Sequence, residues 1–393
     1  MRYQPNIPTP PDRAPGAFLF PGVGGVEAGS EIVPDRRLAI LAEGQFSPHA
    51  GKTAVGVLRY GPDPVVAVLD STRAGLTAAD VLGLRGARFD VPIVADLRTA
   101  LTRDPRPTAL LIGIAPTGGR LPAAWRATIL EAIAAGLEIH SGLHTFLGDD
   151  PELAAAASAA GVAIVDYRRP PERMETAVGR RHRDGSRVIL TVGTDCAIGK
   201  MSVALELRRA ALEAGRSASF VPTGQTGMMI EGWGVAVDRL VADFAQGTCE
   251  WLSEEGERRG DWVLVEGQGS LDHPAYSSVT LALIHGFTPH AMVMVHKPGL
   301  DDHDFDHLPE RRFPIADLPG FIELHERVAG LVAPSRVVAI ALNTSRIADE
   351  TEARAEIART AERTGLPTDD PVRFGAARLW AAIEARVEAL PWH

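Results

Sequence analysis

The sequence predicts an α/β protein in which a Rossmann-like parallel-sheet domain is followed by a second α/β domain. Short apolar runs alternate with longer helical patterns along most of the chain, an order typical of parallel sheets covered by helices. The chain has 393 residues, which is long for a single hydrophobic core. A polar, arginine-rich stretch at 171–186 divides the alternating pattern in two, and we expect it to be an interdomain linker.

The first domain is expected to span residues 17–170, after an irregular arm at 1–16 that contains five prolines. Its helical patterns include 52–58 and 123–135. The apolar runs that we interpret as buried strands are Leu38–Ala42, Val65–Leu69, Val91–Val94, Ala109–Ile114 and Val162–Val165. The G-x-G-x-x-G pattern of a dinucleotide site is absent, so a bound dinucleotide is only the weaker expectation for this domain.

The second domain is expected to span residues 187–393 and to begin with a buried strand at 187–192. A helical pattern follows at 201–215, and two more helical patterns lie near the C-terminus, at 350–364 and 376–390. The further strands that we predict are Ala218–Val221, Trp262–Glu266, Ala291–Val295 and Val337–Leu342.

A glycine-rich turn ending in lysine lies between the first strand and the first helix of this second domain. This order builds the phosphate site of P-loop proteins, because the N–H groups of the turn and the helix N-terminus point at the anion. Lys200 adds a mobile positive charge. The predicted cofactor-binding residues are Gly193, Thr194, Cys196, Ala197, Ile198, Gly199, Lys200, Met201 and Ser202.

The turn departs from the usual P-loop pattern at the position that binds magnesium. Gly199 comes six positions after Gly193, where the usual pattern has five, and Met201 stands where Ser or Thr normally follows the lysine. A thioether is a poor ligand for a hard cation. The sequence therefore predicts an anion site but does not favour magnesium-dependent nucleotide hydrolysis, unless Ser202 takes over after a shift of one position.

Carboxylates at this edge of the second sheet are the candidates for proton transfer. Glu266 ends a predicted strand, where an acid of a P-loop fold faces the phosphate turn. The simpler interpretation is that Glu266 caps the next segment. Asp195 lies inside the phosphate turn, which suggests that it binds a substrate amine or orients Lys200. The predicted catalytic set is Glu266, Asp195 and Lys200.

Polar side chains after the strand at 218–221 are candidates for substrate binding. Thr223, Gln225 and Thr226 follow that strand and are expected beside the phosphate turn, where open α/β sheets bind ligands. Asp238 and Asp243 come later in the same region and could line the same cleft. Turn chemistry alone would also explain the neighbouring glycines.

A metal site is not expected. His303, Asp304, Asp306 and His307 resemble a ligand set, but their flanks are acidic and we interpret the segment as a solvated loop. Only two cysteines are present, Cys196 and Cys249, which excludes a disulfide scaffold and a cysteine-rich metal centre.

The charge and hydropathy of the chain limit its partners. A formal net charge of -10 disfavours nonspecific nucleic-acid binding, which needs a basic surface. No apolar run is long enough to span a bilayer and no secretory signal is visible, so we expect a cytoplasmic protein without membrane partners. We expect a homo-oligomer that acts on a small molecule.

Several of these segments together resemble one family. GTDCAIGKM, VPTGQTGMMI, VADFAQGTCEWL, VEGQGSLDHPAYSSVTLALIHG and LPTDDPVRFGAARL are similar, in this order, to the DgcN-type D-glutamate N-acetyltransferases, and SGLHTFLGDDPEL in the first domain also fits. The resemblance implies a P-loop domain, acetyl-CoA as the acetyl donor and an amino-acid amine such as that of D-glutamate as the acceptor. It also implies that the phosphate turn holds the phosphates of coenzyme A, and it adds Gln268, Ser270 and His273 to the substrate-binding residues.

Two other classes compete with this interpretation. The turn is also similar to that of dethiobiotin synthetases, which implies an ATP- and magnesium-dependent ligase or kinase in which Asn343 could bind adenine. A nonenzymatic nucleotide-binding regulator is the third class, and the strand-end Glu266 argues against it.

Overall fold

The computed structural model describes residues 36–48, 51–114, 119–303 and 311–391. The predicted arm at 1–16 lies outside these residues. The described chain forms two six-stranded sheets in which every pair of neighbouring strands is parallel. The predicted fold class is therefore confirmed.

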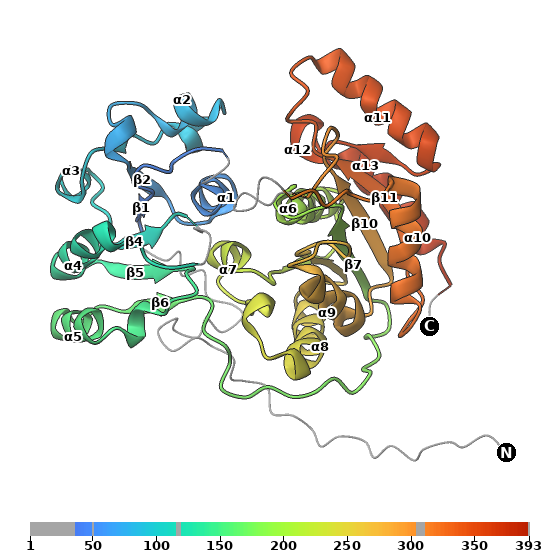
Figure 1. The fold of residues 1–393 in the computed structure, drawn as a ribbon, viewed down its shortest axis with the longest axis horizontal. Helices are drawn as coiled ribbons and strands as arrows, with labels where there is room; N and C mark the ends of the chain where they lie inside the picture. The colour runs from blue at the N-terminus through green and yellow to red at the C-terminus, as the bar shows by residue number, and fades with distance from the viewer. Residues whose placement is uncertain (1–35, 49–50, 115–118, 304–310, 392–393) are drawn as a thin grey trace. The chain divides into compact units, whose positions relative to one another are not determined.

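The first sheet has the strand order β3-β2-β1-β4-β5-β6, the order of a Rossmann fold. Figure 1 shows its strands side by side. Five strands were predicted, but β5 was not, because its sequence Glu-Ile-His-Ser lacks an apolar run. The strands are β1 (Leu38–Leu41), β2 (Val65–Leu69), β3 (Ile93–Val94), β4 (Ala109–Ile112), β5 (Glu138–Ser141) and β6 (Ile164–Asp166).

The helices between these strands are short. The longest, α5, has Pro151 in its first turn, and the Asp150 side chain accepts from two N–H groups there, so both start signals are present. The helices are α1 (Lys52–Tyr60), α2 (Ala78–Leu82), α3 (Leu97–Leu101), α4 (Arg126–Ala134) and α5 (Pro151–Ala160).

The second sheet has the order β12-β11-β10-β7-β9-β8, so the strand before the phosphate turn, β7, is central. The two-residue strand β12 was not predicted, since it is too short for a period-2 pattern. The strands are β7 (Arg187–Gly193), β8 (Ala218–Val221), β9 (Trp262–Val265), β10 (Ala291–His296), β11 (Arg336–Leu342) and β12 (Thr368–Asp369).

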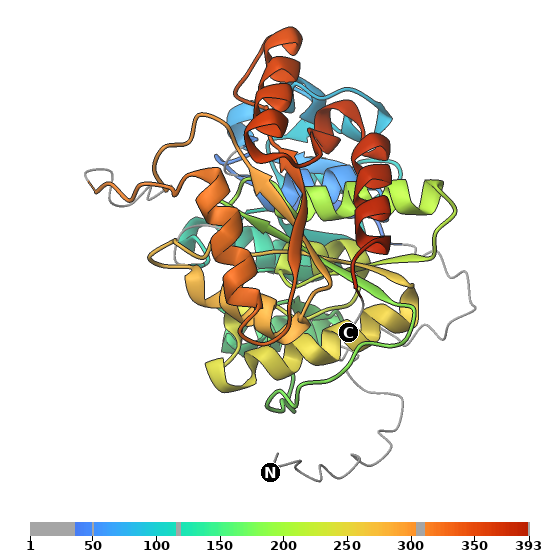
Figure 2. The same ribbon diagram turned by 90° about the vertical axis from the view of Figure 1, so that its right-hand side faces the viewer.

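Helices cover both faces of this second sheet, because successive side chains of a strand point to opposite faces. Leu190 of β7 packs with residues of α8, α9 and α10, whereas Ile189 packs with residues of α6 and α13. Figure 2 shows α10 in orange and α13 in red on opposite sides of the strands. The helices are α6 (Lys200–Glu213), α7 (Gln225–Glu231), α8 (Ala242–Arg259), α9 (Ser277–Phe287), α10 (Leu318–Ala329), α11 (Glu350–Thr364), α12 (Pro371–Phe374) and α13 (Ala377–Glu388).

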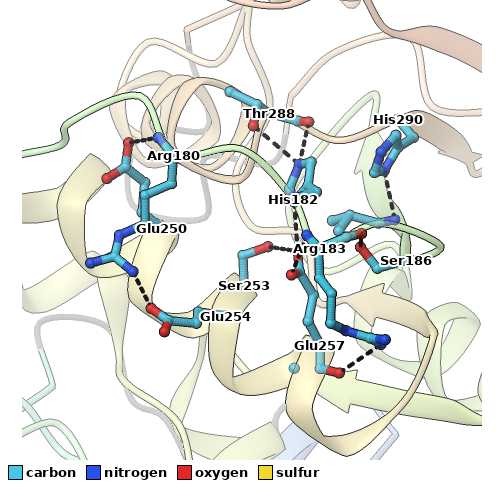
Figure 3. Close-up of polar contacts among 12 residues, drawn as sticks. Arg180, His182, Arg183, Ser186, Glu250, Ser253, Glu254, Glu257, Thr288 and His290 are labelled. Atoms are coloured by element: carbon cyan, nitrogen blue, oxygen red, sulfur yellow. Dashed lines mark hydrogen bonds and ion pairs between the residues drawn. The ribbon is translucent and has the colours of Figure 1, made fainter. Parts of the chain in front are cut away.

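The segment between the two sheets is fastened to α8 by an acidic stripe on that helix (Figure 3). The Glu250 carboxylate accepts from the N–H groups of residues 178, 179 and 180, at 2.7–3.3 Å. One and two turns later, Glu254 pairs with Arg180, and Glu257 accepts from the His182 ring at 2.6 Å. A cavity of about 310 Å³ lies between the segment and the helix. The predicted linker is thus an ordered strap.

None of the helices in the described ranges is both long and apolar enough to cross a membrane.

The strap yields a stability prediction. Glu250→Gln replaces the carboxylate with an amide whose NH2 group cannot accept from the strap, so it should lower the free energy of unfolding by about 1–3 kcal/mol. Glu255→Gln on the same helix, where the side chain pairs with the exposed Arg258 and Arg259, should cost less than about 0.5 kcal/mol. Urea titration of both variants measures the difference, and equal losses would contradict the strap's contribution.

Candidate functional site

The candidate site lies at the carboxyl ends of β8, β9, β7 and β10, four neighbouring strands of the second sheet. Parallel strands end at one edge, which brings their following loops together. The loop after β7 is the phosphate turn, the loop after β9 begins with Glu266, and the loop after β8 contains Thr223. The residues predicted from three separate motifs are therefore neighbours here.

The phosphate turn has the backbone of an anion cradle. Ala197 and Gly199 have positive φ angles of 54° and 111°, and α6 begins at Lys200. The Lys200 ammonium donates to the carbonyl of Asp195 at 2.6 Å, and burial lowers the pKa of Lys200. Lys200 is thus bonded to the backbone of its own turn. Its charge becomes available to a ligand only when this hydrogen bond opens.

Residues from neighbouring strand ends hold the turn in place. The Asn343 amide after β11 donates to the carbonyl of Ile198 at 2.8 Å. The Thr194 hydroxyl lies 3.0 Å from Nδ1 of His296, and burial lowers the pKa of that histidine to about 4, so the ring is neutral. Asn343, which the ligase hypothesis assigned to adenine, contacts the phosphate turn in this structure.

The two residues after Lys200 face the first helix of the chain, α1. The Met201 methyl group lies so near Gly56 that a Cβ there would be 3.1 Å away. The Tyr60 phenol of α1 donates to Glu206 at 3.1 Å beside Ser202, and its pKa is raised to about 12, chiefly by burial. The hydroxyl that could replace the missing magnesium ligand thus lies next to α1.

Glu266 is a buried carboxyl group whose pKa lies near neutral pH. Its Oε2 accepts from the N–H groups of Thr223 and Gly224, at 2.9 and 3.0 Å. Burial raises the pKa of Glu266, the two hydrogen bonds lower it, and the result is about 7. A group with this pKa can both accept and release a proton at physiological pH.

Thr223 and Gln268 support this carboxyl group from the protein side. The Thr223 hydroxyl donates to the carbonyl of Glu266 at 2.8 Å. The Gln268 amide donates to the carbonyl of Thr223 at 2.6 Å. These contacts join the loops after β8 and β9 into one unit.

Asp195 takes part in a buried network of charges. One of its carboxylate oxygens lies 3.0 Å from Nδ1 of His303, and Asp272 lies 3.1 Å from the other ring nitrogen. Burial lowers the pKa of His303, but the bonds to Asp195 and Asp272 outweigh it and raise the pKa to about 9. Ser270 donates to Asp272 at 2.7 Å. The expectation of a solvated loop is wrong for His303, which is 5% exposed; Asp304, Asp306 and His307 lie outside the described residues.

Asp195, His273 and His303 also place one possible metal ligand each within 4.8 Å of one another. The hydrogen bonds argue for a different use of these groups. The N–H of Ala275 donates to Nδ1 of His273 at 3.1 Å, so in the neutral ring Nε2 carries the proton. A ligating imidazole needs its proton on the other nitrogen. The trio therefore fits a hydrogen-bonded charge network better than a metal centre.

Contacts from the first sheet complete the surroundings of the site. The Gln225 amide donates to the Thr53 hydroxyl of α1 at 2.8 Å, and the Thr226 hydroxyl lies 3.2 Å from the same group. Gly142, after β5, packs against Gln225 so closely that a Cβ there would overlap the amide oxygen. Gln225 and Thr226, predicted as ligand-binding residues, contact the first domain.

Comparison with known proteins identifies the family. A family model described as a P-loop domain of unknown function, DUF1611, matches residues 175–380, and its companion, a Rossmann-like domain, matches residues 71–170. The chain belongs to the DUF1611 family. The family resemblance predicted from the sequence motifs is therefore confirmed.

Relatives and a solved structure agree with this placement. The chain is 36% identical over 340 residues to a D-glutamate N-acetyltransferase of Tritonibacter scottomollicae, covering 86% of this chain and 95% of that protein. A D-glutamate N-acetyltransferase of a Pseudoalteromonas species is 39% identical over 274 residues, covering 70% and 80%. A crystal structure of a DUF1611 protein from Anabaena variabilis has a TM-score of 0.81 and 40% identity, covering 89% of this chain and all of that one.

Sequence reasoning missed several residues of this DUF1611 site. Asp272, Tyr60 and Arg168 lie against residues named from the sequence, but none of the three was itself predicted. Asp272 carried a signal, since it precedes His273 within one of the family motifs. Tyr60 and Arg168 carried none, because their contacts are made across long separations in sequence.

The His303 network yields a pH prediction. The folded pKa of about 9 exceeds the ordinary value of 6.5, so its stabilisation is fully present below about pH 6.5 and is lost as pH rises through about 9. The gap in unfolding free energy between wild type and His303→Gln should be on the order of 2–3 kcal/mol larger at pH 6 than at pH 10.

His325→Gln is the matched control for this experiment. His325 is fully buried, and burial lowers its pKa to about 4, so the ring stays neutral over the whole range. Because only the unfolded ring takes up a proton near pH 6, its stability gap from wild type should be about 1 kcal/mol smaller at pH 6 than at pH 10, a small change opposite in sign to that of His303→Gln. A pH-independent gap for His303→Gln would show that the ring is not charged in the folded protein.

Proposed function

We propose that this protein is an acetyl-CoA-dependent N-acetyltransferase that acts on the amine of D-glutamate or a closely similar acidic amino acid. Two relatives that the chain matches over most of its length bear the name D-glutamate N-acetyltransferase. The observation that carries the proposal is the buried Glu266 carboxyl group beside the phosphate turn, with its pKa near 7.

Glu266 is the proposed general base. Acetyl transfer forms a bond between the amine nitrogen and the acetyl carbon and breaks the carbon–sulfur bond, so coenzyme A leaves as a thiolate that takes up a proton. The attacking amine must lose protons, and a carboxylate with a pKa near 7 accepts one efficiently at neutral pH. Two N–H groups hold Glu266 in one orientation, which favours a defined transfer geometry.

The phosphate turn is the proposed site for the phosphates of coenzyme A. Its positive φ angles at Ala197 and Gly199 and the start of α6 suit an anion. Binding would exchange the bond between Lys200 and the Asp195 carbonyl for one between Lys200 and a phosphate. No hydroxyl ligand for magnesium is needed for this role.

Asp195 and Gln268 are assigned supporting tasks. The Asp195 carboxylate already faces His303, so we infer that it orients the turn and leave the base role to Glu266. Gln268 donates to the carbonyl of Thr223 and thereby fixes the loop that holds Glu266. Thr223 contributes its N–H to the same carboxylate.

The ligase or kinase alternative is disfavoured by the same residues. It needs a hydroxyl directly after Lys200 to bind magnesium, but that position holds Met201, which packs on α1. Asn343 is used to hold Ile198.

Glu266→Gln should lower kcat/KM for the acceptor by about 10²–10⁴-fold, because the amide cannot accept the proton. In the wild type, kcat/KM should rise with pH through about 7 as Glu266 ionises, and this rise should be absent from the variant. Initial rates across the pH range measure both effects.

Glu231→Gln provides the control for that variant. Burial also raises the pKa of Glu231, but this carboxylate pairs with Arg208, away from the phosphate turn. Its pH profile should match that of the wild type. Full turnover by Glu266→Gln would remove Glu266 as the base.

Acetyl-CoA should raise the melting temperature without magnesium, because a ligand that binds only the folded state stabilises it. Lys200→Met should reduce the shift caused by acetyl-CoA more than it changes the melting temperature of the unliganded protein. Thermal-shift titration with acetyl-CoA, and with ATP plus magnesium, decides between the two classes. A shift with magnesium-ATP alone would favour the ligase.

A further inference from the structure

We propose that Arg168 is the specificity-determining residue that binds a carboxylate of the acidic acceptor, at the place that Asp238 takes in this structure. The inference rests on the proposed function and extends it to the acceptor.

The Arg168 guanidinium is held in position before any ligand binds. Arg168 follows β6 at the carboxyl edge of the first sheet, and its Nε donates to the carbonyl of Gly142 at 2.7 Å. Its side chain is only 12% exposed. An arginine fixed through Nε presents its remaining N–H groups as a fork that matches a carboxylate. Among the described residues, its other hydrogen-bond partner is Asp238.

Asp238 is the carboxylate that pairs with the Arg168 guanidinium in this structure. It pairs with Arg168 from the one-turn 3-10 helix at Val237–Arg239, which belongs to the second domain. Its side chain is 24% exposed, twice the figure for Arg168. The better anchored partner is therefore the arginine, and the carboxylate is the partner that a ligand can replace.

A second observation marks the same place. The buried Gln225 amide oxygen has no hydrogen-bond partner among the described residues, although the amide nitrogen is bonded to Thr53 and Thr226. This oxygen lies against Gly142, the residue whose carbonyl holds Arg168. A buried polar atom without a partner costs free energy, which a ligand group can recover.

The Arg168–Asp238 pair lies near Glu266, the proposed base. Asp238 and Arg168 both lie near enough to Glu266 to act on its pKa, the first raising it and the second lowering it. Arg239 adds a positive charge near the same loop, lying over the Phe146 ring at 5.4 Å. A ligand carboxylate that displaces Asp238 therefore finds a guanidinium already in place near the proposed base.

The test compares the two partners of one ion pair. Arg168→Gln should raise KM for D-glutamate at least about tenfold, because the carboxylate loses its charged fork. Asp238→Asn should lower KM for D-glutamate, because the competing carboxylate is gone. KM for acetyl-CoA should stay unchanged in both. A merely structural ion pair would move both variants in the same direction and lower both melting temperatures alike.

Arg169→Gln is the matched control, since Arg169 is 43% exposed and pairs with Asp149 and Asp166. Its KM for D-glutamate should equal that of the wild type. The same set of variants assayed with D-glutamine shows which carboxylate is bound: a loss restricted to D-glutamate identifies the side-chain carboxylate, and a loss with both identifies the α-carboxylate. Either result supports the proposal.

Two results would overturn it, and they are distinguishable. A wild-type protein that acetylates acidic amino acids, with KM for D-glutamate unchanged or raised alike in Arg168→Gln and Asp238→Asn, removes Arg168 as the anchor and leaves the proposed function intact. A wild-type protein that acetylates no acidic amino acid removes the proposed function together with its acceptor. If Arg168→Gln does not fold, Arg168→Lys and Asp238→Asn give the same comparison.

Discussion

The bond between the Glu266 carboxylate and the N–H groups of Thr223 and Gly224 is the interaction on which the rest of the site depends. It joins the end of β9 to the loop after β8 and fixes where α7 begins. The start of α7 carries Gln225 and Thr226 to the Thr53 hydroxyl of α1. The buried carboxyl group that we propose as the base thus also positions the residues that contact the first domain. Burial accounts for both properties, because it raises the pKa and makes each hydrogen bond strong.

The phosphate turn is held in one conformation by contacts within the protein. Its lysine bonds the Asp195 carbonyl, and Asp195 in turn faces His303. Asn343 and His296 hold the turn from the neighbouring strands. A cradle kept rigid by such contacts loses little conformational entropy when an anion binds. Met201 stands where the usual P-loop has the hydroxyl that binds magnesium, which is compatible with the proposed coenzyme.

Both sheets contribute to the site because each presents the carboxyl ends of its strands. Arg168 and Gly142 come from the first sheet, whereas Glu266 and Gln225 come from the second. The strap after Arg168 is clamped to α8 by Glu250, so the chain between the two halves of the site is ordered. Under the proposed function, the second domain would hold the donor and the first domain would supply the anchor for the acceptor.

The sequence by itself determined the fold class, the family and the phosphate turn, because each depends on local patterns. Apolar runs of strand length indicate the fold class, and glycines and a lysine between strand and helix indicate the phosphate turn. It also indicated Glu266, since an acid at the end of a buried strand is a local pattern. It did not determine β5, whose polar residues are buried only by their neighbours in the sheet. The pairing of His303 with Asp195 and Asp272, of Tyr60 with Glu206 and of Arg168 with Asp238 was decided by the tertiary structure alone. These partners are 31 to 146 residues apart in the sequence. Which side chains meet across such separations depends on the order of the parallel strands within each sheet.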